Sequence, residues 1–146
     1  IFACGGGQKL YESPIALSQM TRTTLAVTEL KKNNLPYLVC FVDPCAGGIT
    51  ASFAMLGDIH FAEKGALIGF AGRKVIQATV KEELAQDFQS AEFVESHGFV
   101  DRVIHRKDLK KEIITLLSIL LKKDSEVNSS NINETSELSS KTREAS

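Results

Sequence analysis

The sequence lacks the motifs of several common binding and catalytic sites. Neither GxxxxGK[ST] nor GxGxxG occurs, which argues against a P-loop and against a Rossmann dinucleotide site. No apolar run approaches the roughly 20 residues that cross a bilayer. The net charge of −1 predicts no strong attraction to nucleic acid or to a membrane surface. The length of 146 residues is that of a single domain, and the apolar content is ordinary for a globular protein.

Potential metal-binding side chains are few and widely spaced. The three cysteines show no CxxC or CxxH spacing, so neither a disulfide framework nor a zinc site is indicated, and a reducing compartment fits best. They are Cys4, Cys40 and Cys45. The three histidines have no metal-ligand partner at short spacing, and we interpret them as surface or partly packed residues. They are His60, His97 and His105.

The most informative stretch is a strand followed by a glycine turn. An apolar run over residues 37–42 reads as a buried strand, and Gly47 and Gly48 follow it. Residues 49–55 predict a helix. Glycines let the backbone approach a ligand closely, and a new helix presents unpaired N–H groups. This pattern fits a site for a phosphate or a developing oxyanion, or else a tight turn that only packs a helix on a sheet.

The same arrangement occurs at the beginning of the chain. Residues 1–4 look like the end of a strand already under way, so we expect a fragment whose upstream sequence is missing. Gly5, Gly6 and Gly7 then form a turn. A helix is predicted from about Pro14 to Asn33. Its expected core stripe consists of Leu17, Met20, Thr24, Val27 and Leu30.

Strands and helices continue to alternate through the rest of the chain. Further strands are predicted at residues 59–62, 66–70 and 100–104. Short helices are predicted at 75–79, 81–85 and 90–97, the last capped by Ser90 and ended by Gly98. A final helix begins at Asp108 and continues to about 123, with a buried face of Ile113, Leu116, Leu117 and Leu120. The Ser-, Asn- and Glu-rich residues 124–146 are expected to be a disordered polar tail, leaving residues 1–123 as the folded domain.

Alternating strands and helices predict an α/β fold, in which ligands collect at the carboxyl ends of the strands. Both glycine turns directly follow a strand, so they can line one site. One backbone donor from each turn would make an oxyanion hole for a thioester or a ureido carbonyl. Chemistry of that kind needs no side-chain nucleophile.

Four side chains suggest other chemistry. Cys4 stands beside the first turn without an obvious base, and we interpret it as inert. Ser52 resembles the nucleophile of Clp-type serine peptidases, but His60 comes too early and His97 too late for that family. A single-chain hydratase of the crotonase type would need a carboxylate near the turns. The candidates for it are Asp43 and Asp58, which we interpret as structural residues.

The segment from residue 43 to residue 84 resembles the β subunit of the acetyl-CoA carboxylase carboxyltransferase of bacteria and plastids. The most specific parts are Ala51-Ser52-Phe53-Ala54-Met55-Leu56-Gly57-Asp58 and Ile68-Gly69-Phe70-Ala71-Gly72. The resemblance continues through Gln89-Ser90-Ala91-Glu92-Phe93 and covers about residues 3–122.

The resemblance implies a crotonase-like (ClpP/crotonase) fold of ββα units, here a partial domain. It implies a β subunit that pairs with an α subunit, in an α2β2 assembly, and works with biotin carboxyl carrier protein and biotin carboxylase. A carboxyl group would pass from biotin on the carrier to acetyl-CoA, giving malonyl-CoA for fatty acid synthesis. Gly47 and Gly48 would be the backbone oxyanion donors, and Gly5, Gly6 and Gly7 would lie on the acyl-CoA side.

The chain departs from the family in two respects. The family arginine of the first turn is replaced by Gln8, which cannot supply that charge. The four-cysteine zinc ribbon that the family carries is missing, so zinc is expected only in that missing part. A non-catalytic remnant that only binds the α subunit, or another crotonase-type acyl-CoA enzyme, therefore remains an alternative. The polar tail and the altered turn suggest a plastid stroma location, with the bacterial cytoplasm as the alternative.

Overall fold

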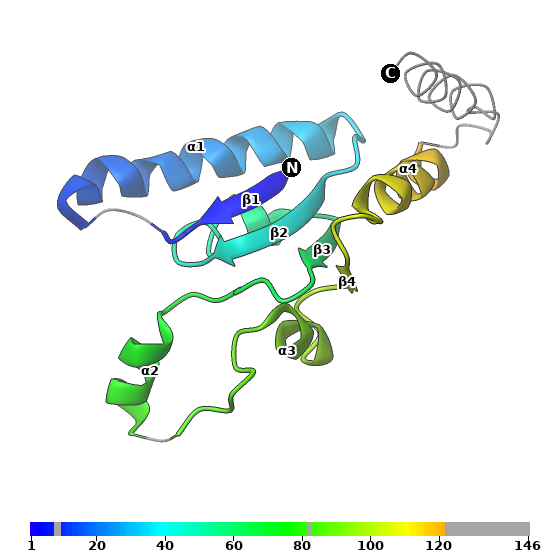
Figure 1. Ribbon diagram of the computed structural model, residues 1–146. Coiled ribbons are helices and arrows are strands. Elements are labelled where there is room, and N and C mark those ends of the chain that lie inside the picture. Colours follow the sequence, from blue (N-terminus) through cyan, green and yellow to red (C-terminus); the bar gives the residue numbers. More distant parts are fainter. Residues whose placement is uncertain (8–9, 82, 122–146) are drawn as a thin grey trace, which may run out of the picture. The chain divides into compact units, whose positions relative to one another are not determined.

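The computed structural model describes residues 1–7, 10–81 and 83–121 of the chain. Its strands form one parallel sheet in sequence order, as Figure 1 shows. They are β1 (Phe2–Gly5), β2 (Leu38–Cys45), β3 (Ile59–Glu63) and β4 (Arg102–Ile104). The described residues divide into two units, residues 1–113 and residues 114–121. The predicted α/β class with a parallel sheet is confirmed.

Helices connect the strands. They are η1 (Leu10–Glu12), α1 (Ser13–Lys32), η2 (Phe53–Leu56), α2 (Arg73–Val80), α3 (Ala91–Ser96) and α4 (Leu109–Leu120), where η denotes a 3₁₀ helix. The crossover through α1 lets β1 and β2 run in the same direction. As predicted, Pro14 lies in the first turn of α1 and Asn33 caps its end.

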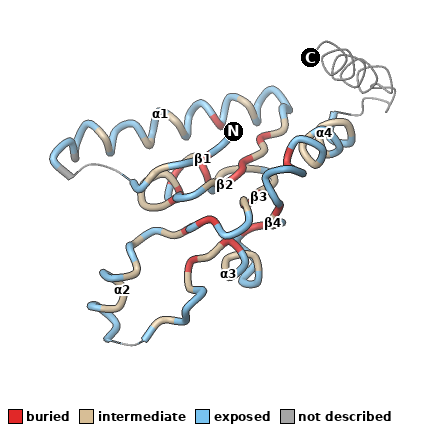
Figure 2. Tube along the Cα trace, in the orientation of Figure 1, coloured by how far each residue is buried: buried red, intermediate tan, exposed pale blue. Residues whose placement is uncertain are grey.

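The core is built on the two central strands. Val39, Phe41 and Cys45 of β2 and Phe61 and Ala62 of β3 are at most 2% exposed, and Figure 2 shows buried positions gathered along these strands. Apolar runs of this kind are typical of parallel strands covered on both faces. Because β2 is fixed so firmly, the turn at its end has a rigid base.

The buried stripe of α1 differs from the prediction. Val27 is buried, and the partly buried positions are Ala16, Met20, Thr23 and Leu30, at spacings of three and four residues. Leu17 is 59% exposed, and Thr24 is also exposed. The helix is therefore rotated by about one residue from the predicted phase, and its main contacts outside its own first turn are with η2.

The prediction of a helix at residues 49–55 is wrong. The chain makes irregular turns there and then the short η2. The Oγ1 atom of Thr50 lies 2.9 Å from the carbonyl oxygen of Gly47 and shares its one proton between this carbonyl and that of Gly69, and the hydroxyl of Ser52 donates to the carbonyl of Gly48. Serine and threonine side chains that bond nearby carbonyls compete with regular helix formation.

Two further short elements are absent from the described residues. Residues 66–70 are not a strand, since they pair only through single bridges of Ile68 with Cys45 and of Leu67 with Ser90. Residues 81 and 83–85 are not helical. Lys81 is left-handed and ends α2, and the guanidinium of Arg73 binds the carbonyls of residues 84–86 that a helix would use internally.

The other predicted elements are confirmed with small shifts of their ends. Ser90 caps α3 by accepting the N–H of Phe93 at 3.1 Å, and Gly98 follows with φ +77°. In α4, Ile113, Leu116 and Leu117 are partly buried, whereas Leu120 is 42% exposed. The predicted end of this helix at residue 123 and the predicted tail at 124–146 lie outside the described residues.

Candidate functional site

The two glycine turns meet at the carboxyl ends of β1 and β2. A Cβ placed on Gly47 would lie 2.8 Å from the Cα of Gly7 and 3.4 Å from the carbonyl oxygen of Gly6. Gly47 has φ +67° and Gly7 has φ +108°, backbone conformations that favour glycine. The N–H of Ala46 also donates to the carbonyl of Gly5 at 2.9 Å. The structure thus brings together the two turns that the sequence placed on one edge.

The two amides of the second turn have different environments. The N–H of Gly47 donates to the carbonyl of Phe70 at 3.1 Å. In the part of the chain that the structure describes, the N–H of Gly48 has no acceptor. Among the described residues, the amide of Gly47 is therefore occupied by a bond within the chain, and that of Gly48 is not.

Residues Ile68 to Ala71, called segment 68–71 below, are hydrogen-bonded to the second turn and to the residues on either side of it. The N–H of Gly69 donates to the carbonyl of Cys45 at 3.1 Å, and Thr50 donates to the carbonyl of Gly69 at 2.7 Å. Together with the Gly47–Phe70 bond, these contacts join the segment to the end of β2 and to the residues after the turn. The sequence gave no sign that these residues, predicted as part of a strand, fix the turn.

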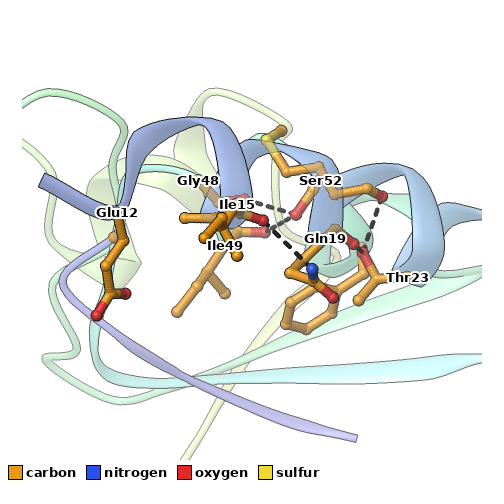
Figure 3. Close-up of a pocket in the computed structure, with 11 residues that line it drawn as sticks. Glu12, Ile15, Gln19, Thr23, Gly48, Ile49 and Ser52 are labelled. Atoms are coloured by element: carbon orange, nitrogen blue, oxygen red, sulfur yellow. Dashed lines mark hydrogen bonds between the residues drawn. The ribbon is translucent and has the colours of Figure 1, made fainter. Parts of the chain in front are cut away.

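A cavity of about 350 Å³ lies beside the turns. Figure 3 shows Ile15, Gln19 and Thr23 of α1 together with Gly48, Ile49 and Ser52 from the second turn and the segment after it. Gly7 of the first turn also lines it. Glycine amides and mostly neutral side chains fit an oxygen that becomes negative during a reaction, since an N–H donor can approach it without a counter-charge.

Glu12 carries the only ionisable side chain among the described residues that line the cavity. Sequence reasoning missed this residue. It considered Asp43 and Asp58, but the carboxylate of Asp43 accepts the N–H of Leu67 at 2.9 Å, and that of Asp58 accepts the N–H of Tyr37 at 2.8 Å. Both aspartates therefore have structural roles, as predicted. The signal that could have identified Glu12 is its position just before Pro14, at the start of the helix that follows the first turn.

The side chain of Ser52, the rival nucleophile considered from the sequence, is bonded within the chain. The hydroxyl of Ser52 is directed to the carbonyl of Gly48, and the Nε2 atom of His60 lies 3.1 Å from the carbonyl of Ala54. Burial raises the pKa of Cys45 to about 11, with a smaller contribution from Cys4 nearby, so its thiol stays protonated at neutral pH. Cys4 is exposed, with its sulfur 3.6 Å from the carbonyl of Asp43.

Two properties of the described residues bear on the class of site. They contain no group of three or more His, Cys, Asp or Glu side chains that could hold a metal ion. None of their helices is both long enough and apolar enough to span a membrane. The position of Gln8 lies outside the described residues.

Comparison with known sequences identifies close relatives. The chain is 66% identical over 137 residues to the acetyl-coenzyme A carboxylase carboxyl transferase subunit beta of Pelagibacter ubique, which covers 94% of the chain and 44% of the relative. It is 51% identical over 121 residues to the same subunit of Methylobacterium nodulans, covering 83% and 40%. It is 47% identical over 135 residues to that of Bartonella henselae, covering 92% and 44%. The chain thus spans about two fifths of the length of these relatives. No protein-family model matches it.

Solved structures share the fold. Transcarboxylase 12S superposes with a TM-score of 0.67 at 25% identity, covering 80% of this chain and 23% of that one. The Pseudomonas malonate decarboxylase MdcD-MdcE hetero-dimer superposes with a TM-score of 0.62 at 22% identity, covering 83% and 52%. These matches confirm the predicted crotonase-like fold, and the sequence matches confirm the resemblance to the β-subunit family.

Proposed function

Because this chain is related over most of its length to the carboxyltransferase β subunits of acetyl-CoA carboxylase, we propose that it is the C-terminal portion of such a subunit. In this role it helps to move a carboxyl group from biotin, borne by a carrier protein, to the methyl carbon of acetyl-CoA, and malonyl-CoA is formed. Residues 1–123 are the proposed catalytic portion.

The observation that carries this proposal is the contact between the two glycine turns beside the cavity. Removing a proton from the methyl group of a thioester moves negative charge onto the carbonyl oxygen. A donor held about 2.7–3.1 Å from that oxygen stabilises the charge more strongly than it stabilises the neutral thioester. We assign this role to the N–H of Gly48. Gly47 supports it by holding the turn against Phe70.

The first turn is proposed to face the acyl-CoA. A Cβ on Gly6 would meet no atom within 4 Å, and Gly7 lines the cavity. The backbone is therefore open to a flat group such as a thioester. When bound, carboxylated biotin supplies the carboxyl group. The neutral lining around Gly48 fits its ureido group, whose carbonyl can also accept an N–H.

The proposed partners are an α subunit, in an α2β2 assembly, together with biotin carboxyl carrier protein and biotin carboxylase. Zinc is proposed only for a ribbon outside this sequence. The bacterial relatives support the bacterial cytoplasm as the location, in preference to the plastid stroma that was expected first.

The test is formation of malonyl-CoA from acetyl-CoA and carboxybiotin. The full-length version of this chain is mixed with an α subunit, and each subunit alone is the control. Activity that appears only in the mixture supports the proposal. A stable complex without activity favours a remnant that only binds the α subunit. In that case Gln8→Arg would restore activity if loss of the family arginine is the cause.

The position of Glu12 favours a second candidate, a crotonase-type acyl-CoA enzyme that uses a carboxylate as acid and base. This candidate predicts that the chain without an α subunit hydrates an unsaturated acyl-CoA and that Glu12→Gln abolishes the reaction. The leading proposal predicts no hydration by either form.

A further inference from the structure

Gln89 is a buried polar residue that contacts the support of the second turn. It is 7% exposed, although it lies between the exposed end of α2 and the start of α3. Its backbone is left-handed, with φ +68°. A residue other than glycine rarely adopts this conformation, which costs about 1 kcal/mol or more unless its surroundings enforce it.

The side chain and the backbone carbonyl of Gln89 are both hydrogen-bonded to segment 68–71. Its Nε2 atom donates to the carbonyl of Ala71 at 2.8 Å, and its own carbonyl accepts the N–H of Ile68 at 2.8 Å. The side chain also lies directly over Gly69, where an added Cβ would be 2.4 Å from Nε2. Gln89 is therefore hydrogen-bonded to the first and last residues of the segment, and its side chain packs against Gly69 between them.

The other bonds of this segment lead to the second turn. Phe70 accepts the N–H of Gly47, and Gly69 is bonded to Cys45 and Thr50. Segment 68–71 thus lies between Gln89 and the turn that carries the N–H of Gly48. A shift of the segment would move the acceptor of Gly47 and so change the direction of the next amide.

From these contacts we propose that Gln89 is a positioning residue for carboxyl transfer, acting through segment 68–71 on the amide of Gly48. This inference rests on the proposed function. Gln89 touches no substrate in this scheme. Its amide side chain fits the role because it donates to Ala71 without a charge that would need its own partner.

The main test replaces Gln89 by methionine in the full-length protein assembled with the α subunit. Methionine has a similar length and no donor. We expect kcat to fall by about 10- to 100-fold. A misplaced oxyanion donor stabilises the transition state less, so the rate falls by part of the factor that removal of the donor would cause. The KM for acetyl-CoA should change less than about threefold. Gln86→Met is the matched control, since the side chain of Gln86 is exposed, and it should leave both constants unchanged.

Gln89→Glu separates positioning from a merely structural role. Ionised, the new carboxylate repels the carbonyl of Ala71, whereas the protonated acid can donate to it. The kcat of this variant relative to wild type should therefore rise as the pH is lowered from 8 to 6. Because a lower pH would also raise the folded fraction of a variant with a buried carboxyl group, kcat is expressed per assembled complex measured at each pH, and loss of folded protein alone would then produce no rise.

The outcomes distinguish the two proposals. An inactive wild-type complex would overturn the proposed function itself. If the wild type is active, a normal kcat of Gln89→Met would overturn the role of Gln89. The role would also be overturned if the Gln89→Met complex formed normally and the kcat of Gln89→Glu relative to wild type did not change with pH. If Gln89→Met fails to assemble, the pH ratio of Gln89→Glu decides.

Discussion

The two glycine turns differ in how they are held. The second turn is hydrogen-bonded by Thr50 and by Gly69 and Phe70 of segment 68–71. In the described residues, the first turn is held mainly by the second, through the carbonyl of Gly5 and the contact of Gly7 with Gly47. This difference implies that the second turn holds the amide that stabilises the oxyanion. The first turn provides an open surface for the acyl-CoA, and its position depends on the second turn.

The strongest way to break this comparison is to change Gly47. In Gly47→Ala the new Cβ would lie 2.8 Å from the Cα of Gly7, a backbone atom that cannot rotate away, at φ +67°. We expect the free energy of unfolding to fall by at least about 2 kcal/mol and kcat to fall by about 100-fold. Denaturant unfolding and malonyl-CoA formation measure the two effects.

Two other glycines are matched controls for this change. A Cβ on Gly6 or on Gly72 would meet nothing within 4 Å, and neither residue has a left-handed φ. Gly6→Ala and Gly72→Ala should therefore unfold like wild type. Equal destabilisation by Gly6→Ala and Gly47→Ala would contradict the claim that the turns are held differently.

Removing one hydroxyl should loosen the second turn without a collision. Thr50 is 7% exposed, and its hydroxyl lies between the carbonyls of Gly47 and Gly69. Thr50→Val keeps the shape and removes the hydroxyl donor from both carbonyls, although that of Gly47 still accepts the N–H of Ala51 at 3.0 Å. We expect a loss of about 1–3 kcal/mol in the free energy of unfolding. Thr24→Val, at an exposed position on α1, is the control and should cost far less.

Ser52→Ala tests whether the second turn acts through its backbone or through a side chain. The hydroxyl of Ser52 donates to the carbonyl of Gly48, so its loss should cost about 1 kcal/mol of stability. Carboxyl transfer should persist, and a fluorophosphonate probe should not label the wild type. Covalent labelling at Ser52 would instead favour the peptidase, and complete loss of carboxyl transfer at unchanged stability would show that the turn acts through this side chain.

The smallest expected effect concerns the cysteines of the two strand ends. Burial raises the pKa of both Cys40 and Cys45 to about 11, while Cys4 is exposed. A thiol reagent at pH 8 should label Cys4 in the native protein and all three after denaturation.

The same raised pKa values affect stability at high pH. Between about pH 9 and 11 the unfolded chain releases thiol protons that the folded chain retains. The free energy of unfolding should therefore fall as the pH rises through this range. Rapid native labelling of Cys45 would show that the end of β2 is less firmly packed than the structure indicates.

Much of this fold could be predicted from local patterns. The strand predicted over residues 37–42, the helix after Pro14 and the cap at Ser90 follow from apolar runs and capping residues, which act over a few positions, although the strand continues to Cys45. The meeting of the two turns followed from topology, because parallel strands end on one edge.

The remainder depends on contacts between distant segments. The sequence predicted a helix after Gly48, because a pattern of helix-forming residues does not show that the hydroxyls of Thr50 and Ser52 will bond nearby backbone carbonyls. The support of Gly47 by Phe70 joins residues 23 positions apart, and the contact of Gln89 with Ala71 joins residues 18 positions apart. No periodicity reports such pairings.

The measurement that tests the central claim most directly is a double-mutant cycle on malonyl-CoA formation with Gly7→Ala, Gly47→Ala and the combined variant. All three are assayed in the full-length protein with the α subunit. If the turns form one site through the contact of Gly7 with Gly47, the combined variant should lose little more kcat than Gly47→Ala alone, since that contact is already broken. A loss equal to the product of the two single effects would show that the turns act independently and would contradict the account.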